Sequence, residues 1–156
     1  MGCVKMAYLD DLIEDCRAAK KAKPIRQFIM AELHELKEIK SAIYIIRERN
    51  ADTVSTFQAF QEFKKKKERR CAKLNHPSST LYVGSSTTGL MKRVKQHLGD
   101  GPRSTYALHL SHWAALQEIE IEILQYDVPR EVLQLIEDSI SVDLKPAFGK
   151  LGGNNK

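Results

Sequence analysis

The chain has 156 residues, of which 42% are hydrophobic and 29% are charged, and its formal net charge is +5. This composition is ordinary for one globular domain with an additional arm, and the positive charge is compatible with a polyanionic partner. No stretch approaches about 18 consecutive apolar residues, which excludes a membrane span. Cys3, Cys16 and Cys71 are far apart and odd in number, which argues against a disulfide framework or a zinc site and favours a reducing, cytoplasmic setting.

Residues 1 to 40 are predicted to form a helical N-terminal arm. Apolar residues recur at helical spacing from Tyr8 to Cys16, and again from Ile25 to Ile39 after Pro24 ends or restarts the helix. The segment RAAKKAKPIR is either a DNA-contacting surface or a solvated helix face, and we favour the solvated face. An amphipathic arm of this kind would also suit a partner helix.

Residues 41 to 156 are predicted to form the main domain, with a helical insertion at about residues 51 to 79. The segment SAIYIIRE is short and rich in Ile and Tyr, which predicts a strand. In the insertion, Thr53 or Ser55 is expected to cap a helix that ends in the basic run KKKKERR. Cations suit a helix C-terminus, so part of this run has a local explanation.

The rest of the domain contains two more strands and two more helices. The strand TLYVG precedes the helix GLMKRVKQHL, which carries Arg93 and His97 four residues apart along one edge of its apolar stripe. The first two strands are expected to pair as a hairpin around the insertion. The segment QEIEIEILQYDV alternates Ile and Glu, as a half-exposed strand does. In the last helix, Glu137 lies at the border of the apolar side, where a carboxylate costs desolvation unless it meets a cation, a donor or a cleft.

Several of these elements recur in one order along the chain. AIY at residues 42 to 44 is followed by YVG at 82 to 84, then by Arg93 and His97 on one helix, by Glu137 on a later helix and by a terminal Asn. This order resembles the GIY-YIG nuclease family over roughly residues 41 to 154.

The chain departs from the family pattern at several positions. Ala42 stands in place of the first Gly, Val83 in place of the second motif's Ile, and the gap between the two tripeptides is far longer than usual. In many members an Asn follows the tail Pro by three residues, where this chain has Gly149. Asn154 is the candidate substitute, with Asn155 as the second choice, and it would hold the substrate or pin the tail over the site.

The resemblance implies an α+β fold, with a small three-stranded antiparallel sheet flanked by helices. It also implies hydrolysis of nucleic-acid phosphodiester bonds with a divalent metal. Because the constellation contains one carboxylate, we expect a single Mg²⁺ or Mn²⁺ ion, held by Glu137 and completed by water and substrate oxygens.

The remaining residues of the constellation fit the other needs of phosphodiester hydrolysis. Arg93 offers a planar fork for the scissile phosphate. Tyr44 and Tyr82 would face each other near the metal, and one of them, Tyr44 in preference, would orient or deprotonate the attacking water. His97 could take that proton or hydrogen-bond Tyr44. Packing of both tyrosines in the strand core is the plain structural alternative.

The sequence therefore predicts a metal-dependent endonuclease acting on double-stranded DNA in restriction, repair or mobile-element biology, as a monomer or a homodimer, without a membrane partner. The basic run of the insertion and the arm would contact phosphates, which position the protein without specifying a sequence. The alternative is a non-catalytic nucleic-acid-binding module on the same fold.

Overall fold

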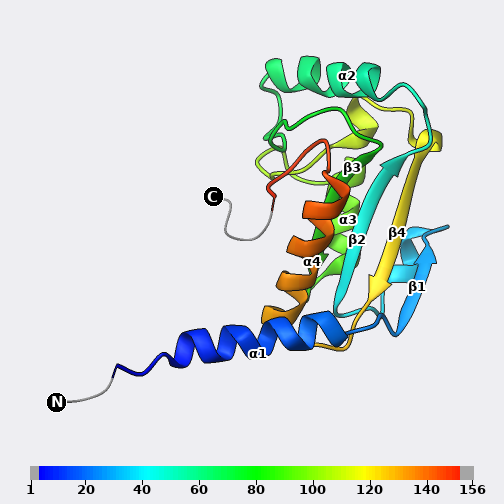
Figure 1. Cartoon of the computed structure of the whole chain (residues 1–156). Helices are drawn as coiled ribbons and strands as arrows, with labels where there is room; N and C mark the ends of the chain where they lie inside the picture. The colour runs from blue at the N-terminus through cyan, green and yellow to red at the C-terminus, as the bar shows by residue number, and fades with distance from the viewer. Residues whose placement is uncertain (1–3, 152–156) are drawn as a thin grey trace.

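The computed structural model describes residues 4 to 151, and its elements alternate between helices and strands along the chain (Figure 1). The α-helices are α1 (Ala7–Lys21), α2 (Thr53–Lys65), α3 (Leu90–Leu98) and α4 (Arg130–Leu144). The strands are β1 (Arg26–Ile29), β2 (Ala42–Glu48), β3 (Thr80–Ser86) and β4 (Ile119–Gln125). Short 3₁₀ turns lie at Leu33–Leu36, Leu110–His112 and Leu116–Glu118.

The strands form one sheet in the order β1-β4-β2-β3, and every neighbouring pair is antiparallel. The α+β class is confirmed, and β2 and β3 pair as the expected hairpin around the insertion. The expectation of three strands is wrong, because β1 adds a fourth strand beside β4.

The expectation of a helix over residues 25 to 40 is also wrong. Ile25, Phe28 and Ile29 fit helical spacing, but the segment after Pro24 is extended and pairs with residues 122 to 125 of β4. The pairing satisfies backbone groups that β4 would otherwise leave at the sheet edge, which a local pattern does not reveal. Further along, Leu36 and Ile39 are buried in the core, so this part of the predicted arm packs with the sheet.

The central strand β2 is buried on both faces, and its alternating side chains enter two separate cores. Tyr44 and Ile46 belong to a core with α2 and α3, whereas Ile43 and Ile45 belong to a second core with α4. Figure 1 shows α4 on the near face of the sheet, with α2 at one end of the molecule and α1 across the other.

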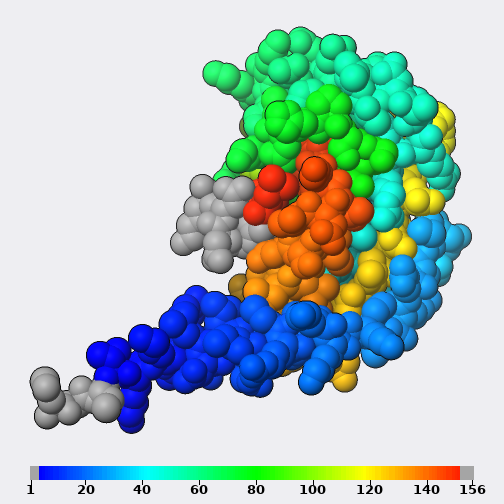
Figure 2. All heavy atoms as spheres, in the orientation of Figure 1, coloured from blue at the N-terminus to red at the C-terminus, as the bar shows by residue number. Residues whose placement is uncertain are grey.

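Helix α1 contains no buried residue, and Ala19 is among the few apolar side chains that it packs against the α4 core. Its N-terminal half projects from the body of the molecule (Figure 2). Within residues 4 to 151, no helix has both the length and the apolar character needed to cross a bilayer.

The insertion begins as expected with a helix, but Asp52 is its cap, not Thr53 or Ser55. The Asp52 carboxylate accepts from the backbone N–H of Ser55 at 3.0 Å. After Lys65 the chain leaves the helix and runs extended to β3, with Cys71 in a parallel bridge to Ala107. Only part of the basic run is therefore helical.

Candidate active site

The two motif tyrosines lie side by side on neighbouring strands and on the same face of the sheet. Tyr44 pairs with Gly84 across β2 and β3, and the rings of Tyr44 and Tyr82 are parallel within 3°, with centroids 6.1 Å apart. A Cβ atom at Gly84 would lie 2.3 Å from the Tyr44 hydroxyl oxygen. The Gly of YVG is therefore needed because the phenol lies directly over the backbone.

Helix α3 brings Arg93 and His97 to these tyrosines. The Arg93 Nη2 atom donates to the Tyr82 hydroxyl at 3.3 Å, while its Nη1 donates to Gln96 at 3.1 Å. The His97 Nε2 atom lies 3.1 Å from the Tyr44 hydroxyl. Their i,i+4 spacing places both side chains on the same edge of the helix, as expected.

The tautomer of His97 follows from its second contact. The backbone N–H of Leu108 donates to His97 Nδ1 at 3.2 Å, so Nδ1 is an acceptor without a proton. Burial, together with the positive charge of Arg93, lowers the pKa of His97 well below its ordinary value, so the ring is neutral. Its proton is therefore on Nε2 and is donated to Tyr44. Of the two expected roles of His97, this geometry favours the hydrogen bond and disfavours proton acceptance.

Both tyrosines are neutral phenols near pH 7. Burial raises the pKa of Tyr44 and of Tyr82, and Arg93 opposes the rise in each case. Tyr44 is only 1% exposed. Its phenol can therefore orient a neighbouring group by donating its proton, but it is poorly suited to remove a proton from water without a further positive charge.

Glu137 approaches from α4, on the opposite face of the sheet. Its Oε2 accepts from Gln134 Nε2 at 2.5 Å. Burial raises the pKa of Glu137, while hydrogen bonds from Gln134 and Ser85 oppose the rise. The charge of Glu137 adds slightly to the rise in the pKa of both motif tyrosines, after the larger effect of burial. Since β3 is an edge strand, side chains from the two faces meet around that edge.

A hollow of about 510 Å³ opens where α3 and α4 meet at the β3 edge. Its wall contains Arg93 together with Ser85 and Gln134, the two hydrogen-bond partners of Glu137. Lys92 and Arg130 add two further cations to the wall. The hollow is therefore polar and positively charged, with the tyrosine pair behind Arg93.

The donor set around Glu137 fits a hard cation. None of the ion pairs in residues 4 to 151 involves Glu137, so its half-buried carboxylate has no cation of its own. Over the same residues, no three His, Cys, Asp or Glu side chains are grouped as a metal cage. A second carboxylate, Asp138, accepts from the same Gln134 amide at 2.9 Å. Carboxylate, hydroxyl and amide oxygens of this kind suit Mg²⁺ that keeps most of its water.

The predicted residue Asn154 lies outside the described residues. At the position three residues after Pro146, Gly149 has a φ of +99°, and a Cβ there would lie 2.6 Å from the Tyr82 ring. A side chain at this position would collide with one of the motif tyrosines. The departure from the family pattern therefore has a local steric reason.

Sequence reasoning missed Asn75, which holds the tail segment in place. Its amide nitrogen donates to the carbonyl of Pro146 at 3.1 Å and to that of Gly149 at 2.9 Å. These two bonds fix the segment from Pro146 to Gly149 to the insertion. Only the family's tail pattern could have suggested the need for an amide, and nothing in the sequence near Asn75 indicated it.

Comparison with known proteins adds no relative. No protein-family model, no curated protein and no solved structure matches this chain. A function for the chain must therefore be argued from the arrangement of its own residues.

Proposed function

We propose that this chain is a metal-dependent endonuclease that hydrolyses phosphodiester bonds of double-stranded DNA. The observation that carries the proposal is the joint placement of Arg93 and the partners of Glu137 in one positively charged hollow. Arg93 is bonded to the phenol of Tyr82, and His97 is bonded to that of Tyr44. A phosphate fork, a carboxylate and two oriented phenols are side chains that phosphodiester hydrolysis can use.

Each side chain has a role that its hydrogen bonds permit. Arg93, half-buried in the wall, would bind the non-bridging oxygens of the scissile phosphate. The Tyr44 oxygen accepts from His97, so its own proton is free to donate to water or phosphate. Tyr82 accepts from Arg93 in the same way. Glu137 would hold a divalent ion, which when bound supplies an acidified water and neutralises phosphoryl charge.

A non-catalytic nucleic-acid-binding module is the second candidate. The observation that favours it is the burial of Tyr44, which raises the pKa of the phenol and makes it a poor base. The hollow would then bind a phosphate through Arg93 without cleaving it.

Cleavage of supercoiled plasmids separates the two candidates. Several unrelated plasmids are incubated with Mg²⁺ or with EDTA and the wild type, Glu137→Gln or Glu131→Gln. Glu131 is an exposed carboxylate on the same helix and is the matched control. We expect Mg²⁺-dependent nicking by the wild type and Glu131→Gln, and a loss of at least about 10²-fold in Glu137→Gln.

Arg93→Lys sharpens this experiment, because it keeps the charge and removes the fork. We expect it to lose about 10²-fold or more in cleavage rate. Cleavage by Glu137→Gln at the wild-type rate would refute the assignment of Glu137. Absence of cleavage on every plasmid, with DNA binding retained, would favour the binding module.

A further inference from the structure

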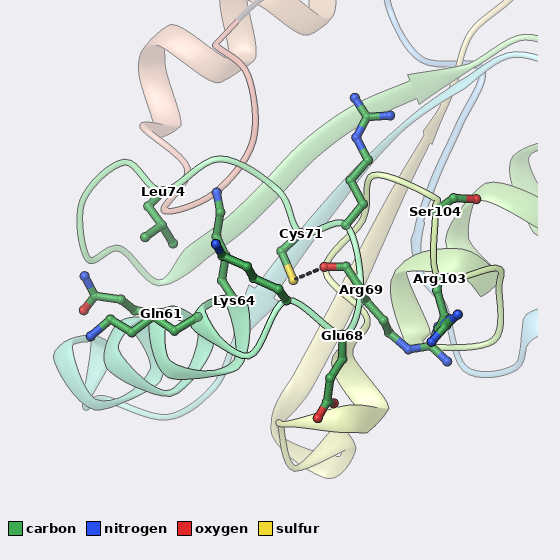
Figure 3. A pocket seen from close by; sticks show the side chains of 11 residues that line it. Gln61, Lys64, Glu68, Arg69, Cys71, Leu74, Arg103 and Ser104 are labelled. Atoms are coloured by element: carbon green, nitrogen blue, oxygen red, sulfur yellow. Dashed lines mark hydrogen bonds between the residues drawn. The ribbon is translucent and has the colours of Figure 1, made fainter.

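A second large hollow lies away from the candidate active site, against the insertion. Its volume is about 860 Å³, and it is bounded by the end of α2, by the extended segment that follows and by the loop at residues 103 and 104 (Figure 3). Six cations line it, namely Lys64, Lys65, Lys67, Arg69, Arg70 and Arg103. We call this hollow the basic cleft.

The basic cleft concentrates the charge of the whole protein. Against its six cations stands one acid, Glu68, which leaves the lining at +5. The formal net charge of all 156 residues is also +5, so the rest of the chain is neutral as a whole. Such a concentration of one sign in a concave surface focuses the field on an anionic ligand.

The dipole of α2 explains only two of these cations. Lys64 and Lys65 occupy the last turn of α2, where the helix dipole favours positive charge. Lys65 also pairs with Glu62, whereas none of the ion pairs within residues 4 to 151 involves the other five cations of the lining. The positive charge of the cleft is therefore mostly uncompensated within the described chain.

Hydrogen bonds hold the walls of the basic cleft together. The backbone N–H of Arg70 donates to the carbonyl of Arg103 at 2.8 Å, and Arg69 Nη1 donates to the carbonyl of Gly101 at 2.9 Å. The His109 ring Nε2 lies 3.0 Å from the Arg70 carbonyl and 2.9 Å from that of Thr105, so it carries a proton donated to both. The cations thus stand on a fixed frame rather than on a loose lysine run.

One aromatic side chain connects the basic cleft with the candidate active site. The Arg70 guanidinium lies 5.5 Å from the ring centroid of Tyr106, and Lys150 Nζ lies 5.8 Å from it. Lys150 directly follows Gly149, where a Cβ would lie 2.6 Å from the Tyr82 ring, so this part of the tail lies between Tyr106 and the motif tyrosines. The Tyr106 hydroxyl accepts from the backbone N–H of Lys73 at 2.8 Å, which fixes the ring. Positive charge therefore continues from Arg93 towards the cleft.

We infer that the basic cleft is a second nucleic-acid subsite, which binds phosphates of double-stranded DNA beyond the scissile bond. The inference rests on the proposed function for the position of that bond, but the binding in the cleft does not require cleavage. A duplex engaged at Arg93 would pass Tyr106 and place its flanking backbone against Arg70 and Arg103. Its contacts are to phosphates, so they add affinity without sequence information.

Binding of a fluorescent DNA duplex of random sequence tests this inference by anisotropy, over a range of salt. All proteins carry Glu137→Gln and are assayed without Mg²⁺, so that no cleavage interferes. The cleft variant is Lys67→Asn, Arg70→Gln and Arg103→Gln, three exposed side chains. Asn is used at Lys67 because this residue has a φ of +56°, which Asn adopts more easily than most residues.

The matched control is Lys37→Gln, Lys40→Gln and Lys145→Asn, which removes the same charge from exposed positions outside the cleft and outside the segment RAAKKAKPIR. We expect the cleft variant to bind about 10- to 100-fold more weakly at low salt, with a salt slope flatter by about two to three. The control should change affinity by less than about threefold. Thermal unfolding of both variants, at an unchanged midpoint, verifies that each is folded.

Every other outcome overturns the inference. An equal loss of affinity in the two variants would mean that DNA responds to the overall charge and not to the cleft. If neither variant loses affinity, or if the Glu137→Gln protein itself does not bind, the cleft binds no duplex. The result is separable from the proposed function. If the cleft variant loses DNA affinity but the wild type cuts no plasmid, only the proposed nuclease activity is refuted. If the wild type cuts plasmids but the cleft variant binds DNA as before, only the DNA-binding role of the cleft is refuted.

Discussion

Strand β2 carries two buried polar side chains on the same face, and their surroundings differ. At one end, Tyr44 is stacked on Tyr82 and receives a hydrogen bond from His97. At the other end, Glu48 accepts a hydrogen bond from Thr56, but its second carboxylate oxygen is buried without a partner. Tyr44 leads through its bonded and stacked neighbours to a positively charged hollow of about 510 Å³, whereas Glu48 lines a smaller hollow of about 150 Å³ without such a set of partners.

The difference shows how burial alone misleads about function. Burial raises the pKa of both groups, yet only Tyr44 belongs to a connected set of polar side chains from several elements. A chain of partners that ends at a hollow is a better indication of a site than one perturbed pKa. For Glu48 the simpler interpretation is a carboxyl group that burial keeps protonated to a higher pH.

The largest expected effect comes from removing the partner of Tyr44. His97→Ala leaves a cavity and deprives both the Tyr44 hydroxyl and the Leu108 N–H of a partner. We expect a loss of about 3–5 kcal/mol in the free energy of unfolding, measured by urea denaturation. Tyr44→Phe leaves only the His97 Nε2–H without an acceptor and should cost about 1–3 kcal/mol. An equal cost for the two variants would mean that loss of the imidazole and of the Leu108 bond adds nothing to loss of the Tyr44 hydrogen bond.

The next effect tests the close approach of Tyr44 to the backbone. Gly84→Ala would place a Cβ 2.3 Å from the Tyr44 hydroxyl, so the ring must move and its hydrogen bond with His97 is lost. We expect a cost of about 2–4 kcal/mol by the same denaturation measurement.

Gly89→Ala is the matched control, since its Cβ would meet nothing closer than Lys92 at 3.8 Å. This variant should remain within about 1 kcal/mol of the wild type. Similar costs at the two glycines would show that the Tyr44 contact is not what requires Gly84.

The sequence predicts the strands and helices that carry the site residues well, because their local apolar pattern and their packing agree. The Ile-rich strands, the helix with Arg93 and His97, and the border position of Glu137 all follow from periodicity. Strand β1 does not, because the spacing of Ile25 and Phe28 suits a helix as well as an edge strand. Only its pairing with β4 decides between them.

The partners of the site residues are predicted less well, because they come from distant segments. The donor to His97 is a backbone N–H 11 residues further along the chain. Asn75 reaches the tail segment across 71 and 74 residues to the carbonyls of Pro146 and Gly149. No periodic pattern encodes such contacts, and they depend on the completed fold.

The smallest expected effect concerns Glu48, and its sign follows from its pKa. Because burial raises the folded pKa of Glu48, the folded state binds its proton more tightly than the unfolded state does. The stabilising contribution of the protonated form is complete below the unfolded pKa, near 4.3, and is lost as the pH rises through the folded pKa. Glu48→Gln stays neutral at every pH, so its free energy of unfolding should not fall in this way as the pH rises.

Chemical denaturation at several values between pH 4 and pH 8 measures the difference. At pH 7 we expect Glu48→Gln to be more stable than the wild type by up to about 1 kcal/mol, and the gap should close towards pH 4. Glu118→Gln, at an exposed carboxylate, is the control and should follow the wild type at every pH. A gap that widens towards pH 4 would mean that Glu48 is stabilised as a carboxylate. Glu48 would then resemble Tyr44 in having a full set of partners.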